Sequence, residues 1–543
     1  WAESLGAKNA HIADALTGKP LEVLKQCVAI NVTGDSQLLG THDVRGLTDW
    51  LHSMHAARLD GKGLGEIAAA LLTAPPAAGK TTLISQAVVL ALERAELVPI
   101  VIRVQLLLTR LRGAQHDEFT STWNWVDAYL KLVHAQQPVL YRMLRQAMMA
   151  RRALLLIDGL DEGGVNRTEI ERHIVEVLTQ QGHIVLCTSR PAGVDAVRFS
   201  GFRRLQLAPL SDDQQREALT QRLGSAGVEA LMPFVQRMLL DVETGERVTA
   251  NPLVLSMVAS VFEIRKGVDM PNTIAKLYES ASEAMLARGG VLSTNMRTLL
   301  EAALFEAHAA QARVITEEQL YRAALAVFAS SGTIAWLDQQ YRADAERLPA
   351  LERAVKQLTS EEREAVAAVR ERVAEDKLPL LSLLQIEPLQ MQSSHLSFQE
   401  YFAARAICSG KYRFHEGSRP PWQWPAFWSN AVKLGAEMGD AFGNGLIKTA
   451  GLGEVLNLSK GKLGGDRATS IAAVAQLMRG LKSLDLSENK LNANEVKELA
   501  GAIIANASLT SVNLLGNHFD TKDASMLLKV KEEKPMLRTL CGL

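Results

Sequence analysis

The chain has 543 residues, a length that suggests about three to five domains with cores large enough to need no cross-links. Hydrophobic residues make up 47% and charged residues 22% of the sequence, which excludes disordered and fibrous proteins. Because 59 Lys and Arg balance 60 Asp and Glu, the net charge of -1 provides no overall field for nucleic acid, and we expect no such partner.

The four cysteines and the hydropathy pattern predict a cytoplasmic protein. The cysteines are scattered without a CxxC pair, which argues against a disulfide framework or a zinc site. No apolar run approaches the roughly 18 residues of a membrane-spanning helix, and the N-terminus lacks the order of a signal peptide. The chain begins with Trp1 and ends at Leu543 within a repeat, so we expect a fragment whose two ends are missing.

The first 210 residues divide into two predicted regions. Residues 1–66 resemble an amphipathic helical region and carry no motif that can be tied to chemistry. Residues 67–210 contain short apolar runs before Ala74 and at 98–104, 153–159 and 183–189, and helical stretches separate these runs. Alternation of this kind is typical of a parallel sheet covered on both faces, so we predict an α/β nucleotide-binding domain.

The middle of the chain is predicted to be mostly helical. A helical domain over 211–286 begins with Ser211 as the N-cap residue. Residues 287–410 are also mostly helical, and the segment LPLLSLLQIEPLQMQ within them can hold short strands. In the following linker, 411–450, the sequence PPWQWPAFW is more typical of a rigid packed junction than of a ligand-stacking platform.

The last region, 451–543, repeats with a period of 28 residues. Aligning LKSLDLSENKL with LTSVNLLGNHF pairs Leu481 with Leu509 and Asn489 with Asn517. This is the pattern of leucine-rich repeats, in which leucines of a short strand enter a stacked core, an Asn bonds to backbone in the turn, and a helix follows. We therefore predict an α/β leucine-rich-repeat solenoid.

A phosphate-binding motif follows the first apolar run. The sequence APPAAGKTT matches [AG]xxxxGK[ST] before a long helical stretch. In a Walker A loop, backbone N–H groups wrap the phosphates at a helix N-terminus, a lysine reaches the β- and γ-phosphates, and a Ser or Thr ligates Mg²⁺. The predicted nucleotide-binding residues are Ala74, Pro75, Pro76, Ala77, Ala78, Gly79, Lys80, Thr81 and Thr82. If position 74 required a positive φ, alanine there would cost about 1 kcal/mol or more.

Two further apolar runs end in residues suited to the same site. RRALLLIDGLDE places Asp158 at a strand end, where a Walker B aspartate meets Mg²⁺, and Asp161 and Glu162 follow as candidates to polarise the attacking water. The alternative is a strand that ends in a solvated acidic turn. The third run ends in Arg190, which can sense the γ-phosphate or be an ordinary surface arginine.

In these motifs the chain resembles the NACHT group of signalling NTPases, the nucleotide-binding core of NOD-like receptors. The matching segments are the Walker A loop, LLLIDGLDE at 154–162, TSRP at 188–191, LAPLSDDQQ at 207–215, NPLVL at 251–255, HLSFQEYFAA at 395–404 and the repeats. The resemblance implies a nucleotide-binding domain (67–210), a helical domain (211–286), a winged-helix domain (287–410), a second helical segment (411–450) and repeats (451–543).

The resemblance also assigns two residues outside the α/β domain to the nucleotide. It implies that Pro252 touches the adenine side and that His395 binds the β-phosphate of ADP and locks a closed state. From the residues alone, Pro252 can be the first residue of a helix, where proline is favoured, and His395 can be a buried structural histidine.

We therefore predict a molecular switch that depends on ATP, ADP and Mg²⁺. In this prediction ADP holds the domains closed, a protein or small ligand on the repeats loosens them, and exchange for ATP permits homo-oligomerisation with slow hydrolysis. The rival predictions are an AAA+-like motor or processing ATPase, and a binding scaffold whose nucleotide is structural.

Overall fold

The computed structural model divides the chain into two compact units, and each is described separately. The first comprises Trp1–Leu292, Ala310–Ile315 and Arg372–Phe398, and the second comprises Ser293–Ala309, Thr316–Glu371 and Gln399–Leu543. The structure describes residues 1–14, 20–25, 27–28, 30–35, 42–60, 67–112, 116–191, 194–195, 197–238, 246–265, 270–288, 290–329, 344–375, 377–414, 419–424, 426–460, 471–472, 474–518 and 521–541.

A six-stranded sheet forms the centre of the first unit, with the strand order β3-β8-β4-β7-β6-β5. Its strands are β3 (Val32–Gly34), β4 (Ala69–Thr73), β5 (Val98–Arg103), β6 (Ala153–Asp158), β7 (Ile184–Ser189) and β8 (Arg203–Leu207). All pair in parallel except β3, which runs antiparallel to β8. The predicted α/β class and the four predicted strands are therefore present.

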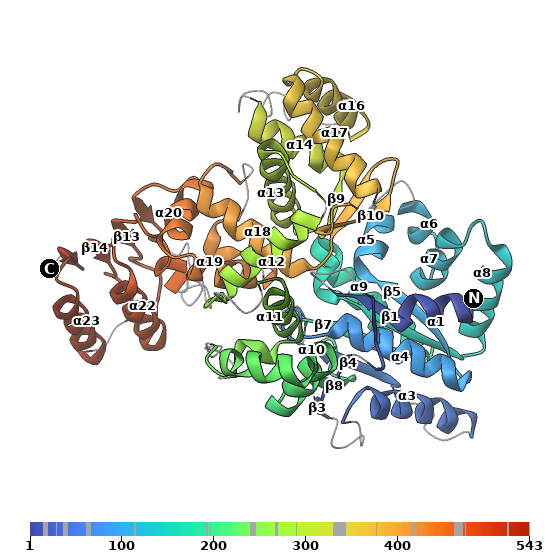
Figure 1. Ribbon diagram of the computed structural model, residues 1–543. Coiled ribbons are helices and arrows are strands. Elements are labelled where there is room, and N and C mark those ends of the chain that lie inside the picture. Colours follow the sequence, from blue (N-terminus) through green and yellow to red (C-terminus); the bar gives the residue numbers. More distant parts are fainter. Residues whose placement is uncertain are drawn as a thin grey trace. The chain divides into compact units, whose positions relative to one another are not determined.

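Helices cover both faces of this sheet, which explains why its strands are apolar without alternation. On one face lie α3 (Val44–Leu59) and α4 (Lys80–Arg94), and α1 (Ala2–Ala10) packs on α4. On the other face a hydrophobic core joins the strands to the neighbouring helices. Figure 1 shows the ribbons of these helices near β5. These helices are α5 (Val104–Arg112), α6 (His116–Thr120), α7 (Trp125–Val133), α8 (Pro138–Met149) and α9 (Arg167–His173).

The prediction of a helical region over residues 1–66 is wrong in part. Besides α1 and α3, these residues form the hairpin β1 (His11–Ala13) with β2 (Pro20–Glu22), and β3 extends the main sheet. β8 was also missed by the sequence analysis. Both errors have one cause, because strands as short as three to five residues leave too few positions for a periodic pattern to be recognised.

The rest of the first unit consists of helices and a small sheet. The helices are α10 (Asp212–Val235), α11 (Pro252–Arg265) and α12 (Ile274–Arg288). Ser211 caps α10 in a capping box with Gln214, as the sequence predicted. The small sheet has the order β10-β11-β9, from β9 (Val314–Thr316), β10 (Leu381–Gln385) and β11 (Gln390–Ser393), so the LPLLSLLQIEPLQMQ segment does hold short strands.

The second unit begins with helices and an aromatic cluster. Its helices include α13 (Thr294–Ala309), α14 (Glu317–Phe328), α16 (Asp344–Val355), α19 (Ser429–Glu437) and α20 (Asp440–Thr449), while α17 (Ser360–Ala374) and α18 (Leu396–Ser409) continue from one unit into the other. The rings of Trp424 and Trp428 stack with their centroids 4.3 Å apart. The ring of Phe414 packs against each of these two rings in a T-shaped geometry. The tryptophan-rich segment is thus a packed junction.

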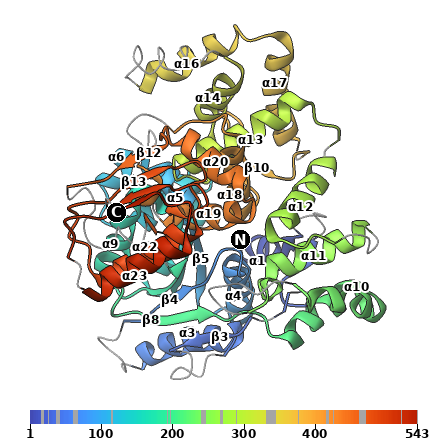
Figure 2. The same ribbon diagram turned by 90° about the vertical axis from the view of Figure 1, so that its left-hand side faces the viewer.

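Four parallel strands, with helices that include α22 (Ala493–Ala505) and α23 (Thr521–Glu533), form the described C-terminal part of the second unit. The strands β12 (Val455–Asn457), β13 (Ser483–Asp485), β14 (Ser511–Asn513) and β15 (Thr539–Leu540) pair in sequence order, and each pairing joins residues 28 apart. Figure 2 shows α22 and α23 beside one another along these strands. The Nδ2 atoms of Asn489 and Asn517 donate to the carbonyls of Leu458 and Leu486, at 2.7 and 2.9 Å.

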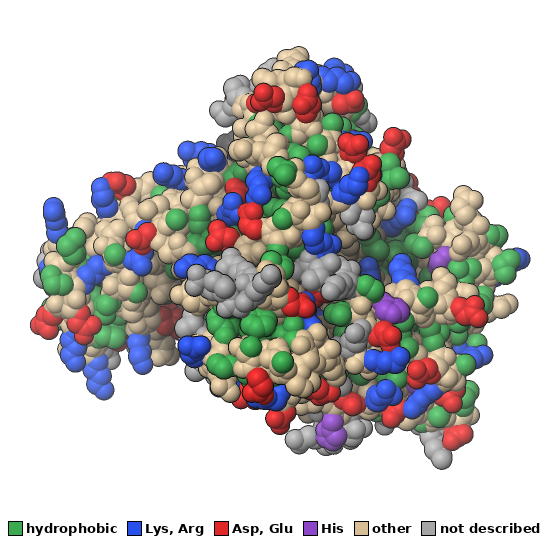
Figure 3. Space-filling model, viewed as in Figure 1, with side chains coloured by type: hydrophobic (Ala, Val, Ile, Leu, Met, Phe, Trp, Pro, Cys, Tyr) green, Lys and Arg blue, Asp and Glu red, His purple; other side chains and the backbone are tan. Residues whose placement is uncertain are grey.

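The surface agrees with the balanced charge of the sequence. Figure 3 shows Lys and Arg side chains interspersed with Asp and Glu side chains over the face in view. Within the described part of the chain, every helix is too short or too polar to cross a membrane.

The core of the first unit predicts a loss of stability in acid. Burial lowers the pKa of His173 and of His183 to about 4, and His173 Nε2 accepts a hydrogen bond from the backbone N–H of Trp125 at 3.1 Å. The unfolded chain binds these protons near pH 6.5 and the folded chain only near pH 4, so the free energy of unfolding falls as the pH drops between these values. We expect a loss of roughly 3 kcal/mol per histidine.

Denaturant unfolding at pH 7, 5.5 and 4.5 measures this loss, with His173→Asn as the test variant and His11→Asn, at an exposed position, as the control. His173→Asn should flatten the dependence on pH, whereas His11→Asn should not. Equal slopes for the parent and His173→Asn would contradict the assignment.

Candidate nucleotide site

A cavity of about 440 Å³ lies in the first unit, at the carboxyl ends of the parallel strands. This volume is typical of small-molecule sites. Most residues of the predicted site line it: Pro76, Ala77, Ala78, Gly79, Lys80, Thr81, Thr82, Asp158, Asp161, Glu162, Arg190, Pro252 and His395. Ala74 and Pro75 stand outside this lining, and their carbonyl oxygens accept hydrogen bonds from Lys80 Nζ at 2.8 and 2.9 Å.

The loop between β4 and α4 provides a phosphate cradle. Lys80 is the first residue of α4, and Gly79 caps it with a left-handed φ of +94°. A side chain at position 79 would be strained by this φ and would also lie 2.5 Å from Ile30 Cδ1. Since α4 is 15 residues long, its N-terminal N–H groups and dipole favour an anion at this loop.

The alanine at the first motif position is accommodated without strain. Ala74 is buried and its N–H donates to Ser189 O at 3.1 Å, while the non-glycine residue with positive φ in this loop is Ala77, at +60°. The free-energy cost of a positive φ at an alanine therefore applies to position 77 and not to position 74. No feature of the motif pattern marks position 77, which is why the sequence analysis did not identify it.

Asp158 is held where a Walker B aspartate is expected. Its Oδ2 accepts from Thr81 Oγ1 at 2.9 Å, and its Oδ1 accepts from Thr188 Oγ1 at 2.6 Å. Thr81 and Asp158 thus present hard oxygen donors side by side, and Mg²⁺ in nucleotide sites is bound by one or two carboxylates together with phosphate oxygens. The donor set fits Mg²⁺, and Thr81 and Asp158 would be its protein ligands.

The two following acids form ion pairs with arginines from other segments. Arg190 Nε lies 3.0 Å from Asp161 Oδ2, and the Arg190 N–H donates to Asp161 Oδ1 at 3.1 Å. Arg313 Nη1 lies 3.3 Å from Glu162 Oε1. The strand order explains the first pair, because β7 lies next to β6 and brings Arg190 beside the residues that follow Asp158. Arg190 is therefore a buried site residue and not an exposed arginine.

Gly159 directly follows Asp158 and leaves space for a neighbouring side chain. Its φ is +84°, and a Cβ atom there would lie 3.2 Å from Glu162 Cδ. The glycine thus makes room for the Glu162 carboxyl group as well as for the turn.

Burial shifts the pKa of three groups that line the cavity. It lowers the pKa of Lys80, against the attraction of Asp161. It raises the pKa of Glu162 to about 7, where Arg313 is the largest opposing influence. It lowers the pKa of His395 to about 4, with Arg313 acting in the same direction, so the imidazole is neutral at neutral pH.

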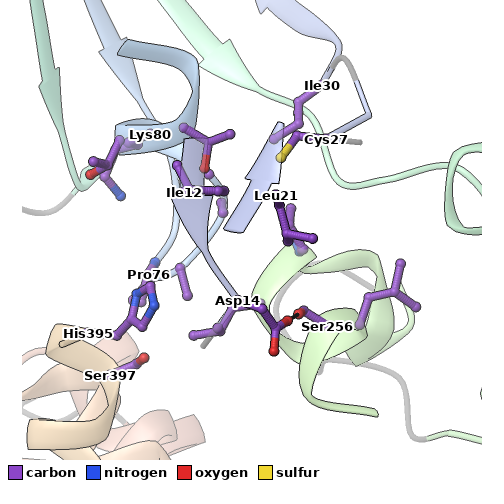
Figure 4. Close-up of a pocket in the computed structure, with 18 of the residues that line it drawn as sticks. Ile12, Asp14, Leu21, Cys27, Ile30, Pro76, Lys80, Ser256, His395 and Ser397 are labelled. Atoms are coloured by element: carbon purple, nitrogen blue, oxygen red, sulfur yellow. Dashed lines mark hydrogen bonds between the residues drawn. The ribbon is translucent and has the colours of Figure 1, made fainter. Parts of the chain in front are cut away.

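Another part of the cavity wall carries apolar side chains, and it is built in part by the N-terminal residues that carried no motif. Figure 4 shows Ile12, Leu21, Cys27 and Ile30 in this part, together with Lys80, Pro76 and His395. A nucleotide also combines both kinds of surface, since one end is a flat apolar base and the other is a chain of phosphates. The N-terminal segment therefore belongs to the site.

Two polar interactions position the apolar part of the wall and were missed by the sequence analysis. Asn251 Oδ1 caps α11 at the N–H of Leu253, and its Nδ2 donates to Pro76 O at 2.8 Å. Buried Asp14 pairs with Arg222 at 2.8 Å and accepts from Ser256 Oγ at 2.9 Å. The partners are 175 and 208 residues apart, and no local pattern indicates them.

The sheet, the loop at the start of α4 and the Thr81–Asp158 pair together constitute a P-loop NTPase fold. Searches of protein-family models and of curated proteins give no match.

Solved structures do match, with low similarity. They include Cdc6p from Pyrobaculum aerophilum, at 10% identity over 68% of this chain and 88% of that chain, with a TM-score of 0.24. Another is Drosophila ORC bound to DNA, at 16% identity over 65% and 85%, with a TM-score of 0.25.

Asn251→Asp tests the contact between α11 and the phosphate loop. Aspartate caps a helix as well as asparagine does, but it cannot donate to Pro76 O. We expect weaker nucleotide binding, by about fivefold or more if a hydrogen bond of about 1 kcal/mol is lost, with little change in the stability of α11. Asn492→Asp is the matched control, because Asn492 also caps a helix, α22. If both variants bind nucleotide like the parent, the Asn251–Pro76 contact has no effect on the site.

Proposed function

We propose that this protein binds ATP and ADP in the cavity and acts as a nucleotide-dependent switch with slow ATPase activity. One observation carries the proposal: four segments distant in the sequence line one cavity, and its wall combines the phosphate loop and its charged neighbours with a group of apolar side chains. They are the N-terminal segment, the sheet with its phosphate loop, the helices α10 and α11, and the residues Arg313 and His395. A ligand in contact with all four stabilises one arrangement of them over others.

The residues around the phosphate loop have separate roles in this proposal. Lys80 and the N–H groups at the start of α4 hold the phosphates, and Thr81 and Asp158 would hold Mg²⁺, which supplies neutralisation of phosphate charge when bound. Lys80 donates hydrogen bonds to two carbonyls of its own loop, and these bonds hold its ammonium group at the phosphate cradle. Pro252 and the apolar wall would contact the base.

Glu162 and Asp161 are the candidates for positioning the water. A carboxyl group with a pKa near 7 is well suited to accept a proton at neutral pH. In the reaction the water oxygen bonds to the γ-phosphorus as the bond to the β,γ-bridging oxygen breaks, and the water proton passes to the Glu162 carboxylate. The ion pairs with Arg190 and Arg313 restrict the positions of the two carboxyl groups.

The finer assignment is a switch of the NACHT and NOD-like-receptor type. The order of α13, β9, α14, α17, β10 and β11 supports a winged helix, and the 28-residue strand register with its asparagine hydrogen bonds supports leucine-rich repeats. His395, between β11 and α18, supports a nucleotide lock, because its neutral imidazole can donate one hydrogen bond to a phosphate without adding a charge. Ligand sensing by the repeats and homo-oligomerisation are parts of the same proposal.

The second candidate is an AAA+-like motor or processing ATPase. The observation in its favour is that a buried acid with a pKa near 7 adjoins the Walker B aspartate, as an enzyme with productive turnover requires. The rate of turnover separates the two candidates. A motor hydrolyses ATP over many cycles, whereas a switch retains ADP after one.

Lys80→Ala and Asp158→Asn should affect nucleotide differently. Lys80→Ala removes a charge from the phosphate cradle and should weaken ATP and ADP alike, by about tenfold or more for a charge-assisted hydrogen bond. Asp158→Asn should mainly weaken the Mg²⁺-dependent binding of ATP. Titration of both nucleotides with and without Mg²⁺ tests this pair. Unchanged affinity in Lys80→Ala would remove the assignment of the phosphate loop.

His395→Ala separates a switch from an ordinary ATPase. The loss of one hydrogen bond to a charged acceptor, about 1.5 to 3 kcal/mol, should speed ADP release by roughly ten- to a hundredfold and populate an extended or oligomeric form. His55→Ala is the control, because His55 is a buried histidine on α3 outside the cavity lining. ADP off-rates and small-angle scattering measure the two effects. A compact His395→Ala that holds ADP like the parent would make His395 structural.

A further inference from the structure

Arg313 lines the cavity. It belongs to none of the sequence motifs, and the proposed function gives its side chain no role. It immediately precedes β9, and its guanidinium group is held by three acceptors. Nε donates to Ser393 O at 3.3 Å, Nη2 donates to Ser394 O at 3.0 Å, and Nη1 lies 3.3 Å from Glu162 Oε1. The planar fork of arginine matches separate acceptors of this kind, whereas lysine presents a single point charge.

The pair is enclosed within the first unit. The side chains of Arg313 and Glu162 are 17% and 15% exposed, yet both line the cavity, so the pair is shielded from solvent at the place where ligand would lie. Charge pairs shielded in this way are screened much less than surface pairs. The contact is therefore strong enough to determine where the Glu162 carboxyl group points.

Among the cations around Glu162, Arg313 has the largest effect on the pKa of its carboxyl group. Asp161 and Asp158 repel its carboxylate, and of the two nearby cations Arg190 pairs with Asp161 and Lys80 donates to carbonyls of its own loop. Within the described part of the chain, Arg313 forms an ion pair with Glu162 at 3.3 Å. Its removal would leave a buried acid facing two others.

We propose that Arg313 is the positioning residue for Glu162, and that it couples the water-activating carboxylate to the backbone that precedes His395. The inference rests on the proposed function and deepens it. Two donors of Arg313 hold the carbonyls of Ser393 and Ser394, and the third holds Glu162. A shift of the segment that carries His395 therefore moves the partner of Glu162, so that hydrolysis proceeds only while this segment is in place.

The experiment measures single-turnover hydrolysis at saturating Mg·ATP and, separately, the affinity for ATP and ADP. The variants are Arg313→Gln, Arg313→Lys, Glu162→Gln and the double variant Arg313→Gln with Glu162→Gln, all in the full chain. Arg198→Gln is the matched control: it breaks another ion pair of an arginine with a buried glutamate, Glu171, at 3.0 Å, outside the cavity lining.

Arg313→Gln should slow hydrolysis at least tenfold and change ATP affinity less than threefold, because Arg313 acts on the orientation of Glu162 and not on the phosphates. Arg313→Lys keeps the charge without the fork and should recover part of the rate. In the Glu162→Gln background, Arg313→Gln should have no further effect, since the group it positions is already absent. Arg198→Gln should hydrolyse ATP like the parent.

Two outcomes would overturn the inference while the proposed function stands. An equal loss of rate from Arg313→Gln in both backgrounds would show that Arg313 acts directly on the phosphates. A parental rate in Arg313→Gln would show that Glu162 needs no partner. If Arg313→Gln fails to fold, the Arg313→Lys variant in the two backgrounds decides between these results. A parent chain that binds neither nucleotide overturns the proposed function together with this inference.

Discussion

The arrangement of charges in the cavity depends on one partly buried ammonium group. Lys80 stands at the first turn of α4, and its charge is placed in a cavity where burial disfavours it. Two backbone carbonyls of the same loop and the nearby carboxylates of Asp158, Asp161 and Glu162 compensate for the lost hydration. Arg190 and Arg313 form ion pairs with two of these carboxylates, those of Asp161 and Glu162. Each charged group in the cavity is therefore compensated by a neighbouring group of opposite charge.

These neighbouring ion pairs explain why segments that are distant in the sequence meet at one place. A buried carboxylate without a partner costs several kcal/mol, so Asp161 and Glu162 need the arginines that β7 and the segment before β9 supply. A triphosphate with Mg²⁺ adds further charge of both signs to this set. A nucleotide in the cavity would lie among ion pairs that join several segments. Its binding would therefore depend on the positions of these segments, as a switch requires.

The motifs predicted the part of the site that is local in sequence. The phosphate loop, Asp158 and the two acids lie next to apolar strands, and a lysine or carboxylate at a strand end is readable without a structure. The same holds for the repeats, because a period of 28 residues is visible in the sequence and reappears as the strand register. Pro252 and His395 required a family resemblance, since a proline at a helix start and a lone histidine have common structural explanations.

The other features of the site could not be predicted from the sequence, and the reasons are physical. The apolar wall is formed by short strands near the N-terminus, whose few residues carry no periodicity. The contacts of Asn251 with Pro76 and of Arg313 with Glu162 join residues 175 and 151 positions apart, and either partner alone resembles an ordinary polar residue. The backbone strain in the phosphate loop is at Ala77, which has a positive φ, although the motif pattern suggested Ala74.

The central claim is that a nucleotide bridges these segments. The most direct measurement is to denature the purified chain, separate the released small molecules by chromatography and compare their amount with the amount of protein. The account predicts about one ADP or ATP per chain and much less from a chain that carries Lys80→Ala. A parent chain that releases no nucleotide, and that also fails to bind added ADP or Mg·ATP, would contradict it.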